Sequence, residues 1–325
     1  MKNASFLPRL AAAVALAGFA LGATAQDFQP TKPIRMVIPS TPGGGTDFIG
    51  RTLSTKLSEA TGWQVVPDNR PGAAGTLGLS ETARARPEGY ELVIGQTANV
   101  ALAPWLMKLT FDPAKDLTPI ASAVEAPMVL LVNESSPFKT WADFVKAAKA
   151  SGKPLSFATS GTGSVAHVAG VMLQEVAGFK LQHVPYKGST PAIADLVGGH
   201  VELAGTSVAS ALSLVQAGKV RALAVTSGKR SQVMPNVPAL AELGYPNFHM
   251  VEWYGVFAPP NLPPAMADRF NAEINKVLQK PEVRNAIVAQ GQEPRMESRA
   301  AFAAMVKADN QKSKEIIGRA GIRVE

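Results

Sequence analysis

Residues 34–47 read IRMVIPSTPGGGTD, and this stretch decides the fold. Its first five residues, 34–38, are mostly apolar and predict a strand. From Thr46 to Ala60 apolar residues recur at helical spacing on one face, and Gly62 is a typical helix stop. The glycine loop therefore joins a strand directly to the start of a helix. That strand–loop–helix unit is the building block of α/β proteins.

The same alternation of short apolar runs and helix-period segments continues along the chain. Strands are predicted at 64–66, 92–94, 129–132, 155–158, 201–204 and 222–225. Helices are predicted at 141–150, at 164–176, from Thr190 onward, at 264–279 and at 299–317. Alternating strands and helices favour parallel sheets with helices on both faces, and such sheets bind ligands at the carboxyl ends of their strands. We therefore predict an α/β fold.

A second glycine loop, TSGTGS at 159–164, also lies between a predicted strand and a predicted helix. Each loop places glycines and hydroxyl groups before a helix N-terminus, where unpaired backbone N–H groups and the positive end of the helix dipole converge. Such a site favours a carboxylate or a phosphate. Ordinary turns with helix caps are the alternative, and two similar loops in one chain make that alternative less attractive.

The residues around the two loops resemble three known motifs, for phosphate binding, dinucleotide binding and serine hydrolysis, but match none of them fully. Residues 45–52 resemble a Walker phosphate loop, but Arg51 replaces the lysine and Gly50 falls inside the predicted helix. Residues 161–166 match the dinucleotide pattern G-x-G-x-x-A, but the next strand, 182–185, does not end in an acidic residue. Ser164 and His167 lack the G-x-S-x-G elbow of serine hydrolases. His167 is then either a ligand-facing or capping group, or an ordinary core or surface histidine.

Composition narrows the class of protein further. The four histidines form no H-x-x-H or H-x-x-x-H pair, which argues against a metal site. The chain has no cysteine, so it has neither a disulfide framework nor thiolate chemistry. Its net charge of +7 is scattered, with no Lys/Arg run of nucleic-acid type, and suits a small anionic ligand.

The first 25 residues predict a cleavable export signal. Lys2 and Arg9 form a positive n-region, residues 10–21 are apolar apart from Gly18, and small residues at 23–25 offer a cleavage site. The apolar run is shorter than the roughly 20 residues that a membrane anchor needs, and no cysteine follows it for lipid attachment. We expect a mature, extracytoplasmic chain of 300 residues, enough for two domains.

Taken together, these segments resemble the Bug family, the solute-binding proteins of tripartite tricarboxylate transporters. The resemblance covers essentially all of the mature chain, and its many motifs in a fixed order make it specific. The stretches that carry it are PGGGTD at 42–47, DNRPGAAG at 68–75, PEGY at 87–90, FDPAKD at 111–116, GTGS at 161–164 with His167, HVPYKG at 183–188, DLVGG at 195–199, AGKVRALAVT at 217–226 and WYG at 253–255.

The resemblance implies a type II periplasmic binding protein, a Venus-flytrap receptor of two α/β domains with a ligand cleft between them. Domain 1 would comprise 26–127 plus 252–325, so that the C-terminal helices complete it, and domain 2 would comprise 128–251. Two hinge segments would cross near 126–128 and 251–253, and the two glycine loops would face each other across the cleft. A carboxylate bridging them would favour closure.

The family pattern also implies a set of ligand-binding residues. The first loop would hold a carboxylate through backbone groups and ordered waters, the second loop would act with His167, and a strand end in domain 1 would line the cleft. Asp47 would be structural, because a carboxylate beside an anion site repels its ligand. The expected ligand-binding residues are Thr41, Pro42, Gly43, Gly44, Gly45, Thr46, Gln96, Thr97, Asn99, Ser160, Gly161, Thr162, Gly163, Ser164, His167, Thr206 and Ser207.

Two departures from the family pattern bear on the ligand. Many relatives have an aromatic residue at the position of Ser40, and many have Asp or Asn at the position of Thr206, where an acidic group would suit an amino group. Thr206 therefore favours a non-amino organic acid: a tricarboxylate, a dicarboxylate or an aromatic carboxylate. The expected partners are membrane permease subunits on other chains, for a periplasmic, monomeric receptor with no cofactor and no nucleic-acid ligand. An exported hydrolase that uses the same cleft is the alternative, and docking of the closed form on a sensor kinase stays open.

Overall fold

The computed structural model describes residues 28–323, so the predicted export signal lies outside the described residues. The strands are β1 (Ile34–Ile38), β2 (Val65–Asn69), β3 (Glu91–Gln96), β4 (Thr118–Asn133), β5 (Leu155–Thr159), β6 (Leu181–Pro185), β7 (Leu203–Ser207), β8 (Val220–Val225), β9 (Val251–Ala258) and β10 (Glu293–Pro294). The α-helices are α2 (Gly45–Thr61), α3 (Thr76–Ala83), α4 (Ala103–Leu106), α5 (Pro113–Asp116), α6 (Trp141–Ala150), α7 (Val165–Ala177), α8 (Ser189–Val197), α9 (Val208–Gln216), α10 (Pro264–Gln279), α11 (Pro281–Ala289) and α12 (Arg299–Ala320). Shorter helical turns are η1 (Ala73–Gly75), η2 (Thr97–Leu102) and η3 (Leu240–Leu243). The helices within residues 28–323 are too short or too polar to span a bilayer.

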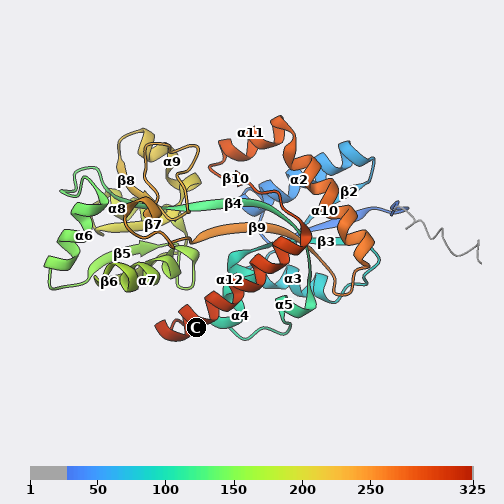
Figure 1. Ribbon diagram of the computed structural model, residues 1–325, viewed down its shortest axis with the longest axis horizontal. Helices are drawn as coiled ribbons and strands as arrows, with labels where there is room; N and C mark the ends of the chain where they lie inside the picture. Colours follow the sequence, from blue (N-terminus) through green and yellow to red (C-terminus); the bar gives the residue numbers. More distant parts are fainter. Residues whose placement is uncertain (1–27, 324–325) are drawn as a thin grey trace, which may run out of the picture.

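The molecule has two lobes joined by two long strands (Figure 1). Lobe 1 contains β1–β3, β10, α2–α5, α10 and α11, and lobe 2 contains β5–β8 and α6–α9. The strands follow the order β2-β1-β3-β9-β4-β7-β5-β6, and β8 and β10 both pair with β4. Within each lobe the glycine loop leaves a strand of a parallel set, β1 beside β2 and β3 in lobe 1, and β5 beside β6 and β7 in lobe 2.

The two joining strands, β4 and β9, run antiparallel along the long axis of the molecule (Figure 1). They pair from Thr118 opposite Ala258 to Pro127 opposite Val251, and Glu252 lies opposite Ala126. Beyond this ladder β4 continues into lobe 2, where it pairs with β7 and β8. The predicted strand at 129–132 is only the end of this 16-residue strand. The sheet is mixed rather than parallel throughout, because β4 and β9 take the chain between the lobes in opposite directions.

Local signals place most of the other elements where the sequence predicts them. Thr140 caps α6 by accepting a hydrogen bond from the Asp143 N–H, and Gly62 ends α2 with a left-handed φ of 75°. The predicted strand at 201–204 begins too early. The His200 N–H still bonds to the Asp195 carbonyl in the turn after α8 (2.9 Å), and pairing with β5 starts only at Leu203.

Apolar cores cover both faces of the strands in each lobe, and the core of lobe 2 also contains Leu102 and Leu106 from η2 and α4. Helix α12 crosses from one lobe to the other (Figure 1): Phe302, near its start, packs against Trp253 and Phe257 of β9. Its last turns place Ile316 and Ile317 in the core of lobe 2. The lobes are therefore held together by β4, β9 and α12.

Candidate functional site

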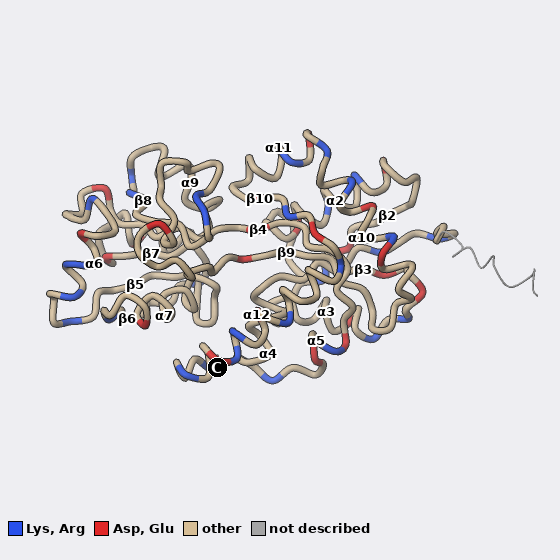
Figure 2. The backbone as a smooth tube through the Cα atoms, in the orientation of Figure 1, with Lys and Arg blue, Asp and Glu red and all other residues tan. Residues whose placement is uncertain are grey.

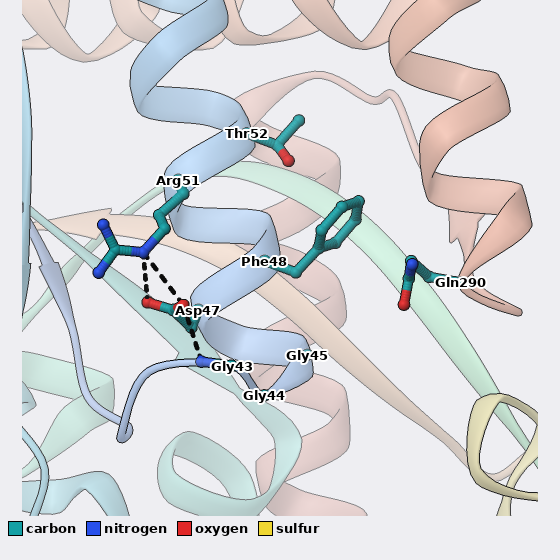
Figure 3. Close-up of a pocket in the computed structure, with 8 residues that line it drawn as sticks. All are labelled: Gly43, Gly44, Gly45, Asp47, Phe48, Arg51, Thr52 and Gln290. Atoms are coloured by element: carbon teal, nitrogen blue, oxygen red, sulfur yellow. Dashed lines mark hydrogen bonds and ion pairs between the residues drawn. The ribbon is translucent and has the colours of Figure 1, made fainter.

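Two cavities border the two glycine loops. The first has a volume of about 380 Å³ and opens beside the N-terminus of α2, facing the turn after α11 (Figure 3). Its walls are formed by Gly43, Gly44, Gly45, Asp47, Phe48, Arg51, Thr52 and Gln290. Gly44 is the N-cap residue of α2, so the free N–H groups of a 17-residue helix open towards this cavity. An anion placed here meets the positive end of the helix dipole.

Asp47 shapes this loop from within. Its carboxylate accepts hydrogen bonds from the Gly43 N–H (2.9 Å), the Asn69 amide (2.9 Å) and the Arg51 guanidinium (2.9 Å). Burial by itself raises the pKa of Asp47, but these hydrogen bonds outweigh it and hold the pKa below its usual value. The Asp47 carboxylate is thus ionised, and the Arg51 guanidinium balances its charge. Gly43 has a φ of +92°, a conformation that glycine adopts without strain.

The second cavity, of about 200 Å³, lies between the lobes. Lobe 1 contributes Ala98 of η2, and the joining strands contribute Met128 and Glu252. The remaining walls come from lobe 2: Ser160, Ser164, Val165, Ala166, Ser189, Thr206 and Ser207. Five of the seven lobe 2 residues carry a hydroxyl group, so this wall is rich in hydrogen-bond donors.

Three helices of lobe 2 begin at the wall of this interlobe cavity. Ser164 caps α7, Ser207 caps α9, and Ser189 is the first residue of α8. Thr206 lines the same cavity and is buried (2 % exposed), and its hydroxyl has no hydrogen-bond partner within residues 28–323. A buried hydroxyl without a partner is costly unless a ligand or water satisfies it. The helix N-termini and this hydroxyl together point to an anionic, oxygen-rich ligand.

Glu252 and Tyr254 of β9 link the two cavities. Glu252 lines the interlobe cavity, and its carboxyl group is hydrogen-bonded to the buried Tyr254 hydroxyl. That hydroxyl also bonds to Thr46, at the start of α2, and lies 3.4 Å from where a Cβ on Gly45 would stand. One chain of polar contacts therefore runs from the first glycine loop to the interlobe cavity.

The second glycine loop is braced by a pair of stacked histidines. The Gly163 N–H donates to Nδ1 of His167 (3.1 Å), and the His167 ring stacks on His183 with a centroid distance of 3.7 Å. His183 in turn bonds to the Thr159 hydroxyl through Nε2 (2.7 Å). Burial, reinforced by the neighbouring ring of His183, lowers the pKa of His167 to about 4. Both rings are therefore neutral at pH 7. The His167 ring supports the loop through its hydrogen bond with the Gly163 N–H.

Acidification is expected to destabilise the fold through this pair. His167 has a pKa of about 4 in the folded chain, against an ordinary value of 6.5. Between these values the unfolded chain binds a proton that the folded chain does not. The free energy of unfolding is therefore at its full value above pH 6.5 and falls as the pH drops towards 4. Urea denaturation at a series of pH values measures this fall. His167→Gln should reduce the slope, and an unchanged slope would contradict this role.

The other predicted residues divide between cavity walls and supporting contacts. The Thr46 hydroxyl donates to Oε1 of Gln96 (2.7 Å), and the Trp253 N–H donates to the Thr97 hydroxyl (2.8 Å). Asn99 is buried and accepts a hydrogen bond from the Gln96 N–H (2.9 Å). Gln96, Thr97 and Asn99 thus brace β3 and β9, while Ala98 between them reaches the interlobe cavity. Thr41 and Pro42 are exposed before the first loop, and Gly161, Thr162 and Gly163 form the turn behind Ser164.

Comparison with known proteins identifies the family. The family model described as tripartite tricarboxylate transporter family receptor matches residues 49–322. The chain belongs to this family. BugT of Bordetella pertussis is 36% identical over 283 residues, covering 86% of each chain. Of the solved structures, R. palustris Rpa4515 with adipate is 30% identical (TM-score 0.77; 91% of this chain, 100% of that one), and MatC (Rpa3494) from Rhodopseudomonas palustris with bound malate is 28% identical (TM-score 0.72; 89% and 100%).

Membership of the tripartite tricarboxylate transporter receptors confirms the predicted fold, a two-domain α/β binding protein with two crossing segments. The sequence reasoning missed Glu252, Tyr254 and Ser189 as residues of the site. The sequence predicts Glu252 only as part of the hinge segment at 251–253. The signal that was available is the polar–apolar alternation of 251–255, which puts Glu252 and Tyr254 on one face of a strand.

Proposed function

We propose that this chain is an exported receptor that captures a small organic carboxylate between its lobes and delivers it to the membrane permease of a tripartite tricarboxylate transporter. The interlobe cavity carries the proposal: the N-termini of α7, α8 and α9 meet there beside the unpartnered Thr206 hydroxyl. The relatives solved with malate and adipate support a carboxylate as the ligand class. Residues 1–25 would direct export to the periplasm, where the mature receptor acts as a soluble monomer.

The proposal assigns the two lobes to two domains that close on the ligand. We place domain 1 at 26–127 plus 252–325 and domain 2 at 128–251, so that β4 and β9 supply the hinge. The turn after α11 supports closure, because a Cβ on Gly291 would stand only 3.0 Å from the Ala209 N at the start of α9. The lobes therefore already touch beside the first glycine loop, and further closure would enclose a ligand bound between the loops.

A hydrolase that uses the same cavity is less well supported. The Ser164 hydroxyl accepts a hydrogen bond from the His167 backbone N–H (3.2 Å), as a helix cap does. Nδ1 of the His167 ring is occupied by the Gly163 N–H. Nucleophilic catalysis needs a ring nitrogen bonded to the hydroxyl and a third group that orients the ring. The contacts of Ser164 and His167 favour a binding role.

A thermal-shift screen tests the proposal. The purified mature chain is heated with citrate, malate, succinate, adipate, benzoate and aspartate, with sodium chloride at matched ionic strength as the control. A carboxylate present at about 100 times its dissociation constant adds about 2.7 kcal/mol of stability and raises the melting temperature. A panel in which every organic acid leaves the melting temperature unchanged would overturn the receptor assignment. A larger shift from aspartate than from the other acids would overturn the preference for a non-amino acid.

Thr206→Val separates ligand binding from stability. Valine has nearly the same shape as threonine, and the Thr206 hydroxyl has no partner within the described chain, so the free energy of unfolding should stay the same or rise. Affinity for the carboxylate should fall about tenfold to 100-fold, the value of a hydrogen bond to a charged group. Isothermal titration calorimetry measures the affinity. Unchanged binding in this variant would remove Thr206 from the site.

A further inference from the structure

The interlobe cavity contains one ionisable side chain, and it has the sign of the expected ligand. Of the residues that line it, all within the described range, Glu252 alone is ionisable, and the lining includes no lysine, arginine or histidine. Figure 2 shows acidic positions on β4 and β9 in the stretch where these paired strands run between the lobes. A carboxylate receptor with an ionised glutamate in its cavity would repel its own ligand.

The charged groups on the surrounding helices and strands lie outside the lining of the interlobe cavity. Glu125 of β4 pairs with Arg295 on the opposite side of the ladder, around a separate cavity lined also by His249 and Asp309. On the lobe 1 side, Asp47 and Arg51 of α2 neutralise each other. On the lobe 2 side, His167 and His183 sit behind the second loop, and Lys187, before α8, is exposed and outside the cavity wall. Lys312 of α12 bonds to the His249 carbonyl. These partners leave Glu252 without a cation beside it.

The polar side-chain group bonded to Glu252 is the Tyr254 hydroxyl. It donates its hydrogen bond to the Glu252 carboxyl group, and it is itself bonded to Thr46 at the start of α2. A hydroxyl donor carries no positive charge, so it does not balance an ionised Glu252 beside an anionic ligand.

The electrostatics of the site favour a neutral Glu252. Burial raises the pKa of Glu252, and the hydrogen bond to Tyr254 offsets that rise only in part. A ligand carboxylate brought into the same cavity disfavours the ionised form further, because two carboxylates that share a site do not both stay ionised. A buried carboxylic acid that stays neutral can donate a hydrogen bond to an anion.

We propose that Glu252 is a specificity-determining residue that meets the ligand as a neutral carboxylic acid, so that one proton is held between Glu252 and a ligand carboxylate. This inference rests on the proposed function and deepens it. The only bond that changes is the O–H bond of the shared proton. Where Glu252 is ionised in the empty receptor, one proton is taken from solvent on binding and returns to solvent on release. The ligand class is then a small acid with at least two carboxylates: one meets the helix N-termini, and the other meets Glu252.

Proton uptake on binding tests the inference. Malate and adipate are titrated into the full mature receptor by calorimetry between about pH 6.5 and about pH 8.5, in buffers of different ionisation enthalpy. In this range both ligands are ionised and His167 stays neutral. We expect uptake of up to one proton per ligand bound, and an affinity that falls by up to about tenfold per pH unit.

Glu252→Gln supplies the second arm, because glutamine is a neutral group of the same shape that can donate through its amide. This variant should take up no proton, should bind with pH-independent affinity, and should bind more tightly than the native receptor at about pH 8.5. The exposed Glu282→Gln serves as the matched control and should behave as the native receptor does. Proton uptake that persists in Glu252→Gln would overturn the inference. Loss of affinity in this variant at every pH would also overturn it, and would make Glu252 an ionised acceptor. If neither malate nor adipate bound the native receptor at any pH in this range, both this inference and the assignment of the chain as a receptor for such acids would be overturned.

Discussion

Gly44→Val is expected to abolish ligand capture while leaving the fold intact. Gly44 has extended backbone angles (φ −89°, ψ 175°) that a β-branched residue adopts readily, and a Cβ added there meets no atom within 4 Å. The valine side chain would project into the space in front of the helix α2 N-terminus, where a carboxylate must approach the backbone N–H groups. Affinity should fall by at least about 100-fold, or about 2.8 kcal/mol.

Calorimetry with the tightest acid of the thermal-shift panel measures this loss, and urea denaturation measures the fold. The free energy of unfolding should change by less than about 1 kcal/mol, the usual range for a substitution in open space. Gly318→Ala is the matched control, because it changes an exposed glycine of α12 that also has open space around it. It should bind as the native receptor does. Native affinity in Gly44→Val would take the first glycine loop out of the site.

Gly255→Ala is expected to have the largest effect on stability. Gly255 lies in β9 between Gly95 of β3 and Ser122 of β4. A Cβ there would stand 2.2 Å from Cζ of Phe302 and 2.9 Å from the Ala121 carbonyl oxygen. The phenyl ring is fully buried and the carbonyl belongs to the backbone, so neither can move away cheaply. Overpacking of this kind costs about 3 kcal/mol.

Urea denaturation of Gly255→Ala should show that loss in the free energy of unfolding. In the same experiment Gly318→Ala should gain about 0.5–1 kcal/mol, because alanine is the better helix former and nothing lies in its way. The pair isolates packing from backbone entropy, since both variants add one methyl group at a glycine. A Gly255→Ala variant as stable as the native chain would show that α12 can shift away from β9.

Residues whose signals are local were predictable from the sequence. Strand β1 and helix α2 follow from apolar spacing within 34–60, with a glycine to end the helix, and Thr140 and Ser164 cap their helices as their positions suggest. Both glycine loops stand at helix N-termini for the same reason. Each of these features depends on contacts between residues that lie close together in the sequence. Such contacts can be predicted from residue types and their spacing.

The site itself needed contacts between distant residues. Glu252 reaches the interlobe cavity only because β9 pairs with β4, which places it opposite Ala126 and between the lobes. The same pairing brings Tyr254 to Thr46, more than 200 residues away in sequence. Thr206 was predicted as a site residue from the family pattern, but its lack of a partner is visible only in the structure.

The sequence by itself determined the α/β class, the two glycine loops and the family, because apolar periodicity, helix caps and motif order are properties of neighbouring residues. Tertiary structure decided which groups share a cavity. Desolvation and the sharing of a proton depend on what lies within a few ångströms in space, and for Glu252 those neighbours come from β4, η2 and lobe 2. For that reason the glycine loops could be predicted from the sequence, and the place of Glu252 in the interlobe cavity could not.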